Sequence, residues 1–161
     1  MKRVFSTLLA LTMVLALAAC GKTEPTPAEA PDLNQYYEDF MASLGEGNAP
    51  AMMDLEGDLV ASYYPGLEKY ETKQMVLKAA AITSVPFEFA LVELADAADA
   101  QAVADIFQDR IDSQVEGGAF YPASVEAWEK AQVLTNGSVV ALISAGDSQQ
   151  DAVDAFNALF A

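Results

Sequence analysis

Apolar residues recur along this chain with two different periods, and each period predicts a different kind of element. Between residues 33 and 44 they lie three and four apart, which places them on one face of a helix. Asp32 followed three residues later by Gln35 is typical of a helix start, and Gly45 is typical of a helix end. A helix is therefore expected over residues 33–44.

The later part of the chain alternates between β-rich apolar runs and helical spacing. Two runs separated by Ser84-Val85-Pro86 predict a hairpin. Two runs that flank Asn136-Gly137 predict another, because Asn-Gly favours the tight turn between paired strands. The elements expected after the first helix are a weaker helix over 50–63 interrupted by Gly57, strands over 75–83 and 87–94, a helix over 97–114, a short helix over 122–130, strands over 132–135 and 138–144, and a last helix over 151–160.

This order, α-α-ββα-α-ββα, predicts an α+β domain. We expect an antiparallel sheet of about four strands, made of two hairpins, with the helices packed on one face. At an offset of 50 residues Phe89 aligns with Val139, and Ala102-Val103 aligns with Ala152-Val153. This alignment suggests a faint repeat of the ββα unit.

Residues 1–19 have the pattern of an export signal. Lys2 and Arg3 precede an uncharged run that ends at Ala19, shorter than the roughly 20 residues that a membrane span needs. The run closes with Leu17-Ala18-Ala19-Cys20. This resembles a lipobox, in which two small residues precede a cysteine that receives a diacylglyceryl group. Cys20 is therefore the expected lipidation site; a plain secretory signal or an uncleaved anchor is the alternative.

The stretch over residues 20–31 is expected to hold the lipidated cysteine and a flexible linker. It has three prolines and no large apolar residue, so it has nothing to bury. Residues 32–161 then form a single domain, long enough to enclose a core.

Charge and composition narrow the possible functions. Loss of residues 1–19 leaves 6 basic and 24 acidic residues, a net side-chain charge of −18. This charge argues against nucleic acid as a partner, because phosphate contacts need clustered Lys and Arg; it favours a basic protein or peptide. The chain has no histidine and one cysteine, so His-dependent catalytic units, disulfides and zinc sites lack their residues. We expect a monomer with no catalytic residues, no cofactor and no metal site.

Arg110 is the only arginine left after the signal, and it lies near the apolar side of its expected helix. A guanidinium there needs a carboxylate or carbonyl partner, and Glu88 or Glu93 on the preceding strand could supply it. The arginine either forms an internal ion pair that fixes the helix to the sheet or receives a ligand carboxylate. Nearby, Tyr121 and Trp128 either expose a surface for stacking a peptide or sugar or pack as a lid on the core.

The acidic residues offer two weaker candidates for cation binding. A stripe of acidic residues on the 97–114 helix is either a binding site for a divalent cation or the solvent-exposed face of the helix. We favour the second, because side chains on one straight helix do not converge on one point. Residues 54–58 resemble a calcium-binding loop only loosely, since Gly57 falls at the wrong position. The stripe consists of Asp105, Asp109, Asp112 and Glu116.

From residue 85 onward the chain resembles a family of small bacterial lipoproteins described only as a domain of unknown function. The resemblance covers about 75 residues plus the lipobox. It implies a lipid-anchored extracytoplasmic domain and no particular activity. It rests on Glu88 and Asp96 at the ends of a strand, Arg110 and Gln114 on the helix, Tyr121-Pro122, Asn136-Gly137, and the amphipathic stretch 151–160.

We therefore expect a non-catalytic binding or structural domain, held at the extracytoplasmic face of a bacterial cell membrane through acylated Cys20. The first alternative is a cell-envelope enzyme that uses Asp/Glu chemistry on wall glycan or peptide. The second is an accessory protein that responds to divalent cations.

Overall fold

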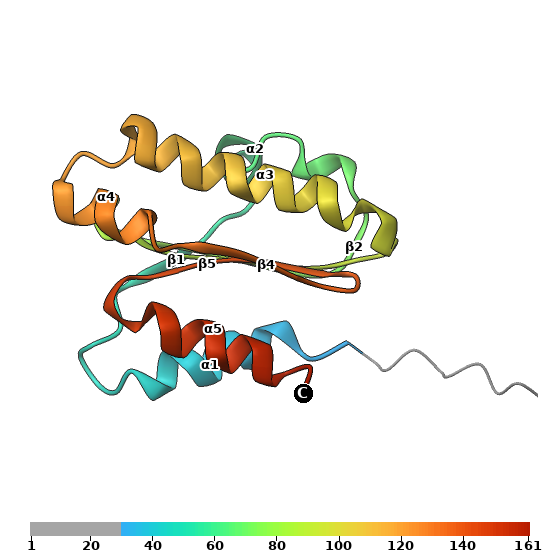
Figure 1. Ribbon diagram of the computed structural model, residues 1–161, viewed down its shortest axis with the longest axis horizontal. Helices are drawn as coiled ribbons and strands as arrows, with labels where there is room; N and C mark the ends of the chain where they lie inside the picture. Colours follow the sequence, from blue (N-terminus) through green and yellow to red (C-terminus); the bar gives the residue numbers. More distant parts are fainter. Residues whose placement is uncertain (1–29) are drawn as a thin grey trace, which may run out of the picture.

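The computed structural model describes residues 30–161 and has an α+β fold with five α-helices and one five-stranded antiparallel sheet. The strands lie in the order β1-β2-β3-β5-β4, and every neighbouring pair is antiparallel. Figure 1 shows three layers, with α2, α3 and α4 on one face of the sheet and α1 and α5 on the other. The elements are α1 (Leu33–Ser43), β1 (Met52–Asp54), α2 (Asp58–Tyr63), β2 (Thr72–Ala80), β3 (Phe87–Leu94), α3 (Ala100–Ser113), α4 (Pro122–Trp128), β4 (Gln132–Asn136), β5 (Val139–Ala145) and α5 (Gln149–Ala158).

Both predicted hairpins are confirmed. β2 pairs with β3 and β4 pairs with β5, and the second pair turns at Asn136-Gly137. The start of α1 is also as expected, because the Asp32 side chain accepts a hydrogen bond from the Gln35 amide. The local signals for turns and caps therefore located these elements correctly.

The expected single layer of helices is wrong, because helices cover both faces of the sheet. The central strands β3 and β5 are buried at every position. Because alternate side chains point to opposite faces, both faces of the sheet must be covered by other elements. One core cluster joins the sheet to α3 and α4 through residues such as Phe107 and Trp128. The other joins it to α1 and α5 through residues such as Tyr36 and Phe156.

The sheet has five strands rather than about four. The additional strand is β1, which lies within the stretch 50–63 that helical spacing had suggested was one helix. Gly57, at a φ of 55°, separates β1 from the short helix α2. Met52 and Met53 pair with Ala80 and Ala79 at the sheet edge, so tertiary pairing overrides their helix propensity.

The faint ββα repeat in the sequence does not correspond to a structural repeat. β3 and β5 are antiparallel neighbours, and a two-fold axis that exchanges such neighbours is perpendicular to the sheet. That axis would put α3 and α5 on the same face. They lie on opposite faces, so no rotation relates the two units.

Candidate functional site

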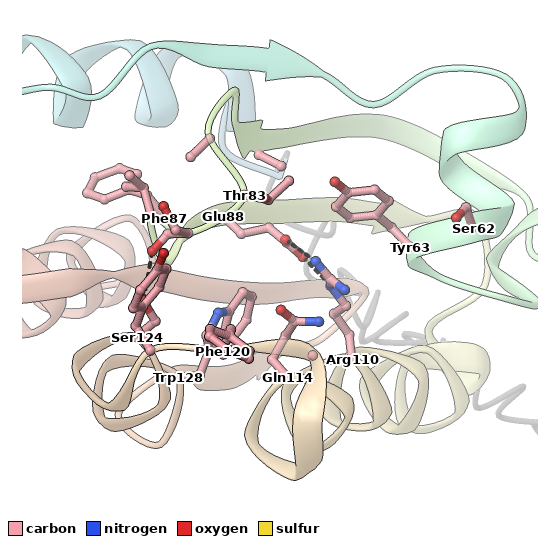
Figure 2. Close-up of a pocket in the computed structure, with 17 residues that line it drawn as sticks. Ser62, Tyr63, Thr83, Phe87, Glu88, Arg110, Gln114, Phe120, Ser124 and Trp128 are labelled. Atoms are coloured by element: carbon pink, nitrogen blue, oxygen red, sulfur yellow. Dashed lines mark hydrogen bonds and ion pairs between the residues drawn. The ribbon is translucent and has the colours of Figure 1, made fainter.

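A cavity of about 510 Å³ opens on the face of the sheet that carries α2, α3 and α4. It lies between the start of β3, the end of α3, α4 and the loop that joins β2 to β3 (Figure 2). Glu88 and Arg110 are the only charged residues among those described that line it, and most of the others are aromatic or carry hydroxyl groups. We call it the Arg110 cavity.

The floor of the Arg110 cavity is a buried ion pair. Arg110 donates two hydrogen bonds to Glu88, from Nε to Oε1 at 2.9 Å and from Nη2 to Oε2 at 2.7 Å. Tyr64 donates a third hydrogen bond, from its hydroxyl to Glu88 Oε1 at 2.7 Å. The Glu88 side chain is 3% exposed and that of Arg110 15%. Both carboxylate oxygens are therefore occupied, and the pair ties α3 to β3.

Aromatic rings hold the guanidinium of Arg110 in place. Its central carbon lies 4.4 Å from the ring centre of Tyr63 and 5.4 Å from that of Trp128. Burial alone would lower the pKa of Arg110, but the hydrogen bonds and negative charge of Glu88 outweigh that effect and raise it. Arg110 is therefore a fixed and permanently charged donor.

Two polar groups of the cavity keep hydrogen-bonding capacity free. Arg110 Nη1 forms no hydrogen bond to any described residue, and residues 30–161 contain no buried side-chain nitrogen or oxygen without a partner. Nη1 is thus reachable by water from the hollows that Arg110 lines, the Arg110 cavity and an adjoining one of about 260 Å³. The Gln114 amide also lines the Arg110 cavity, and Figure 2 shows it beside Arg110 without a hydrogen bond to the residues drawn.

A π-helical turn over Gln114–Gly118 extends α3 and shapes this wall of the cavity. Gly117 has a φ of 154°, and a Cβ on Gly118 would lie 2.4 Å from Gln114 Nε2 and 2.9 Å from the Ser113 carbonyl oxygen. The paired glycines are therefore required by local conformation and close approach. From the sequence they indicated the end of a helix, and a wide turn closed by the Ala119 N–H on the Gln114 carbonyl oxygen ends α3 here.

The mouth of the cavity carries exposed apolar side chains. Phe120 is 88% exposed and Tyr121 57%, and their rings pack edge-to-face at 5.6 Å. Ile82, 64% exposed, lies in the β2–β3 loop whose residues Thr83 to Val85 line the same cavity. Exposed apolar groups that gather at one opening are typical of a binding surface. Sequence reasoning missed Phe120, whose only signal was its position beside Tyr121-Pro122.

The sequence-predicted site residues separate into two places. Glu88, Arg110 and Tyr121 all line the Arg110 cavity. Glu93 does not, because it lies on the opposite face of the sheet, where it accepts hydrogen bonds from Lys73 at 3.3 Å and Gln74 at 2.8 Å. Trp128 also lines the Arg110 cavity but is only 4% exposed and packs in the core, whereas Tyr121 is exposed at the mouth. Cys20 lies outside the described residues.

The candidate cation sites have the character of a solvated surface. All four residues of the acidic stripe are exposed, and two of them accept hydrogen bonds from glutamines one turn earlier on α3. Asp54, at the start of the calcium-like segment, pairs with Lys78 on β2. Within residues 30–161 no group of three or more Asp, Glu, Cys or His side chains is arranged to hold a metal ion. The same part of the chain has no helix long and apolar enough to cross a membrane.

The buried tyrosine that donates a hydrogen bond to Glu88 is expected to make the stability of the fold decrease at alkaline pH. Burial, followed by the charge and hydrogen bond of Glu88, raises the pKa of Tyr64 well above its ordinary value of 10.0. Above about pH 10 the unfolded chain loses a proton that the folded protein keeps, so the stabilisation present below that pH is lost as the pH rises toward the folded-state pKa. We expect the free energy of unfolding, measured by urea titration, to fall less steeply above pH 10 in Tyr64→Phe than in the wild type. Tyr121→Phe is the control, since Tyr121 is exposed; equal slopes for all three proteins would contradict the expectation.

Fold and site together define an α+β domain with an open cavity floored by a buried charge pair. The chain belongs to the family described as a domain of unknown function (DUF4358), which matches residues 45–145. The match includes Glu88, Arg110, Tyr121-Pro122 and Asn136-Gly137, and it begins 40 residues before residue 85, where the resemblance in the sequence starts. It leaves out the last helix, α5. A search of curated proteins and a search of solved structures found no significant match.

Proposed function

We propose that this protein is a non-catalytic binding domain, held by acylated Cys20 at the extracytoplasmic face of a bacterial cell membrane, and that the Arg110 cavity is its ligand site. The anchor is supported by the export signal and lipobox that end at Cys20. The Pro-rich composition of residues 20–31 suits a spacer between the lipid and the domain that follows.

The position of the linker is compatible with this arrangement. The described chain begins at Ala30, which packs against the cluster under α1 and α5. The Arg110 cavity is lined by residues of α3 and α4. These two helices cover the other face of the sheet (Figure 1). An anchor that precedes Ala30 would therefore join the domain on the face opposite to the cavity.

A binding function explains the cavity better than catalysis does. Glu88 is the only acidic residue among the described residues that line it, and three hydrogen bonds occupy both of its carboxylate oxygens. Glycoside hydrolysis needs two carboxyl groups that face the substrate. The observation that carries the proposal is the combination of a fixed guanidinium with a free Nη1 and a mouth formed by exposed Phe120 and Tyr121.

The test uses a photo-crosslinking residue at the mouth of the cavity. With p-benzoylphenylalanine in place of Phe120, irradiation of cells that make the protein natively is expected to give a discrete covalent adduct, because this group inserts into the C–H bonds of whatever ligand lies against it. The matched control is the same residue at Met75, which is 50% exposed and does not line the cavity. No adduct at position 120, or the same adducts at both positions, would overturn the proposed site.

A further inference from the structure

The charge around the Arg110 cavity limits the kind of ligand that it can take. Residues 30–161 contain five basic and 22 acidic residues, a net charge of −17. Inside the cavity the charges of Glu88 and Arg110 cancel. The adjacent α3 and its π-helical turn carry four exposed acidic residues, and α4 carries exposed Glu126. The charges inside the cavity are thus balanced, whereas the exposed surface of the neighbouring helices carries an excess of negative charge.

This arrangement disfavours an anionic ligand even though an arginine lies on the floor. A carboxylate at Arg110 Nη1 would gain a hydrogen bond, but Glu88 already neutralises the guanidinium through two hydrogen bonds. The carboxylate would also have to enter the negative potential of the surface. A ligand whose neutral part enters the cavity and whose positive groups stay at the mouth meets favourable interactions in both places.

The free groups of the cavity match a peptide main chain. Arg110 Nη1 can donate to a carbonyl oxygen, and the Gln114 amide has both a donor and an acceptor, the two groups that pair with a peptide C=O and N–H. Phe120 at the mouth has no polar atoms, so it suits an apolar side chain rather than a hydroxyl-covered ring. A volume of about 510 Å³ lies within the range of about 300–1,000 Å³ that is common for ligand cavities.

We propose that the ligand of the Arg110 cavity is a basic peptide segment of a partner protein, in which an aromatic or aliphatic residue is flanked by Lys or Arg. This proposal rests on the proposed function. The apolar residue packs against Phe120, and a main-chain carbonyl accepts a hydrogen bond from Arg110 Nη1. The flanking cations interact with the acidic residues of α3, its π-helical turn and α4.

The proposal is tested by selecting a library of random heptapeptides against the full-length protein in detergent micelles. We expect enrichment of sequences with Lys or Arg on both sides of an aromatic or aliphatic residue, and a loss of affinity when the salt concentration rises. A synthetic peptide from the enriched set is expected to bind at least about tenfold more weakly to Phe120→Ser and Gln114→Ala, both changes at accessible side chains, and equally well to the control Met75→Ser.

The other outcomes distinguish the two proposals. Enrichment of acidic or uncharged peptides, or of none, overturns the basic-peptide proposal. Binding of a chitin tetrasaccharide that is abolished by Phe120→Ser also overturns the basic-peptide proposal. This result would keep the cavity as a binding site but would assign it a glycan ligand. Binding of the selected peptides that neither Phe120→Ser nor Gln114→Ala weakens would show that the cavity is not the site, and would overturn the proposed function as well.

Discussion

Replacing Cys20 with serine is expected to move the protein from the membrane fraction to the soluble fraction. In the proposed anchor the Cys20 thiol receives the diacylglyceryl unit, and a serine hydroxyl is a much weaker nucleophile at neutral pH. Each buried CH₂ of the acyl chains contributes about 0.8 kcal/mol to membrane binding, so two or more chains make the anchor effectively permanent. Without residues 1–19 the side-chain charge would be −18, which gives no attraction to anionic lipid.

Fractionation followed by mass spectrometry of the N-terminal peptide measures this effect. Lys22→Ala is the matched control, because it changes the same short segment but leaves the lipobox intact. It is expected to remain membrane-bound, with Cys20 acylated. Finding Cys20 unmodified in the native protein, or Cys20→Ser still in the membrane fraction, would remove the anchor from the proposed function.

Breaking the Glu88–Arg110 pair is expected to destabilise the domain strongly. Glu88→Gln leaves Arg110 as an uncompensated charge, and Arg110→Met does the same to Glu88. Because both side chains are almost fully buried, each single change should lower the free energy of unfolding by about 3–5 kcal/mol. Glu88→Gln/Arg110→Met together should lose much less than the sum of the two, since the double change leaves no isolated charge.

Urea unfolding, monitored by Trp128 fluorescence, gives the free energy of unfolding of the wild type, the two single variants and the double variant. Trp128 is the single tryptophan, and it packs against Arg110. The Asp54–Lys78 pair provides the control, because Asp54 is exposed; Asp54→Asn should cost about 1 kcal/mol or less. If Glu88→Gln and Arg110→Met each cost under about 1 kcal/mol and their effects simply add, the pair is not the structural link between α3 and β3 that the geometry indicates.

Elements controlled by short-range interactions were predictable. The Asn136-Gly137 turn and the Asp32 cap depend on residues within a few positions of each other, so their signals survive in any tertiary context. β1 was not predicted, because it depends on a partner far away in the sequence. It is a three-residue strand held by pairing with β2, and its helix-like spacing carried no information about that partner.

The choice between Glu88 and Glu93 was only half decided by the sequence. The two residues are five positions apart on one strand, so their side chains point to opposite faces and could not both meet Arg110. Which of them does so depends on the face against which α3 packs. That choice is made by the whole core, and it placed Glu88 under α3 and Glu93 beside Lys73 and Gln74.

The sequence by itself determined the local elements, the excess of acidic charge and the N-terminal pattern that ends at Cys20, because each depends only on neighbouring residues or on composition. Only the tertiary structure decided that helices cover both faces of the sheet and that Arg110, Gln114 and Phe120 surround one cavity. The physical reason is that burial and ion pairing join residues far apart in the chain. Their relative positions follow from how the three layers pack, and no local pattern records that packing.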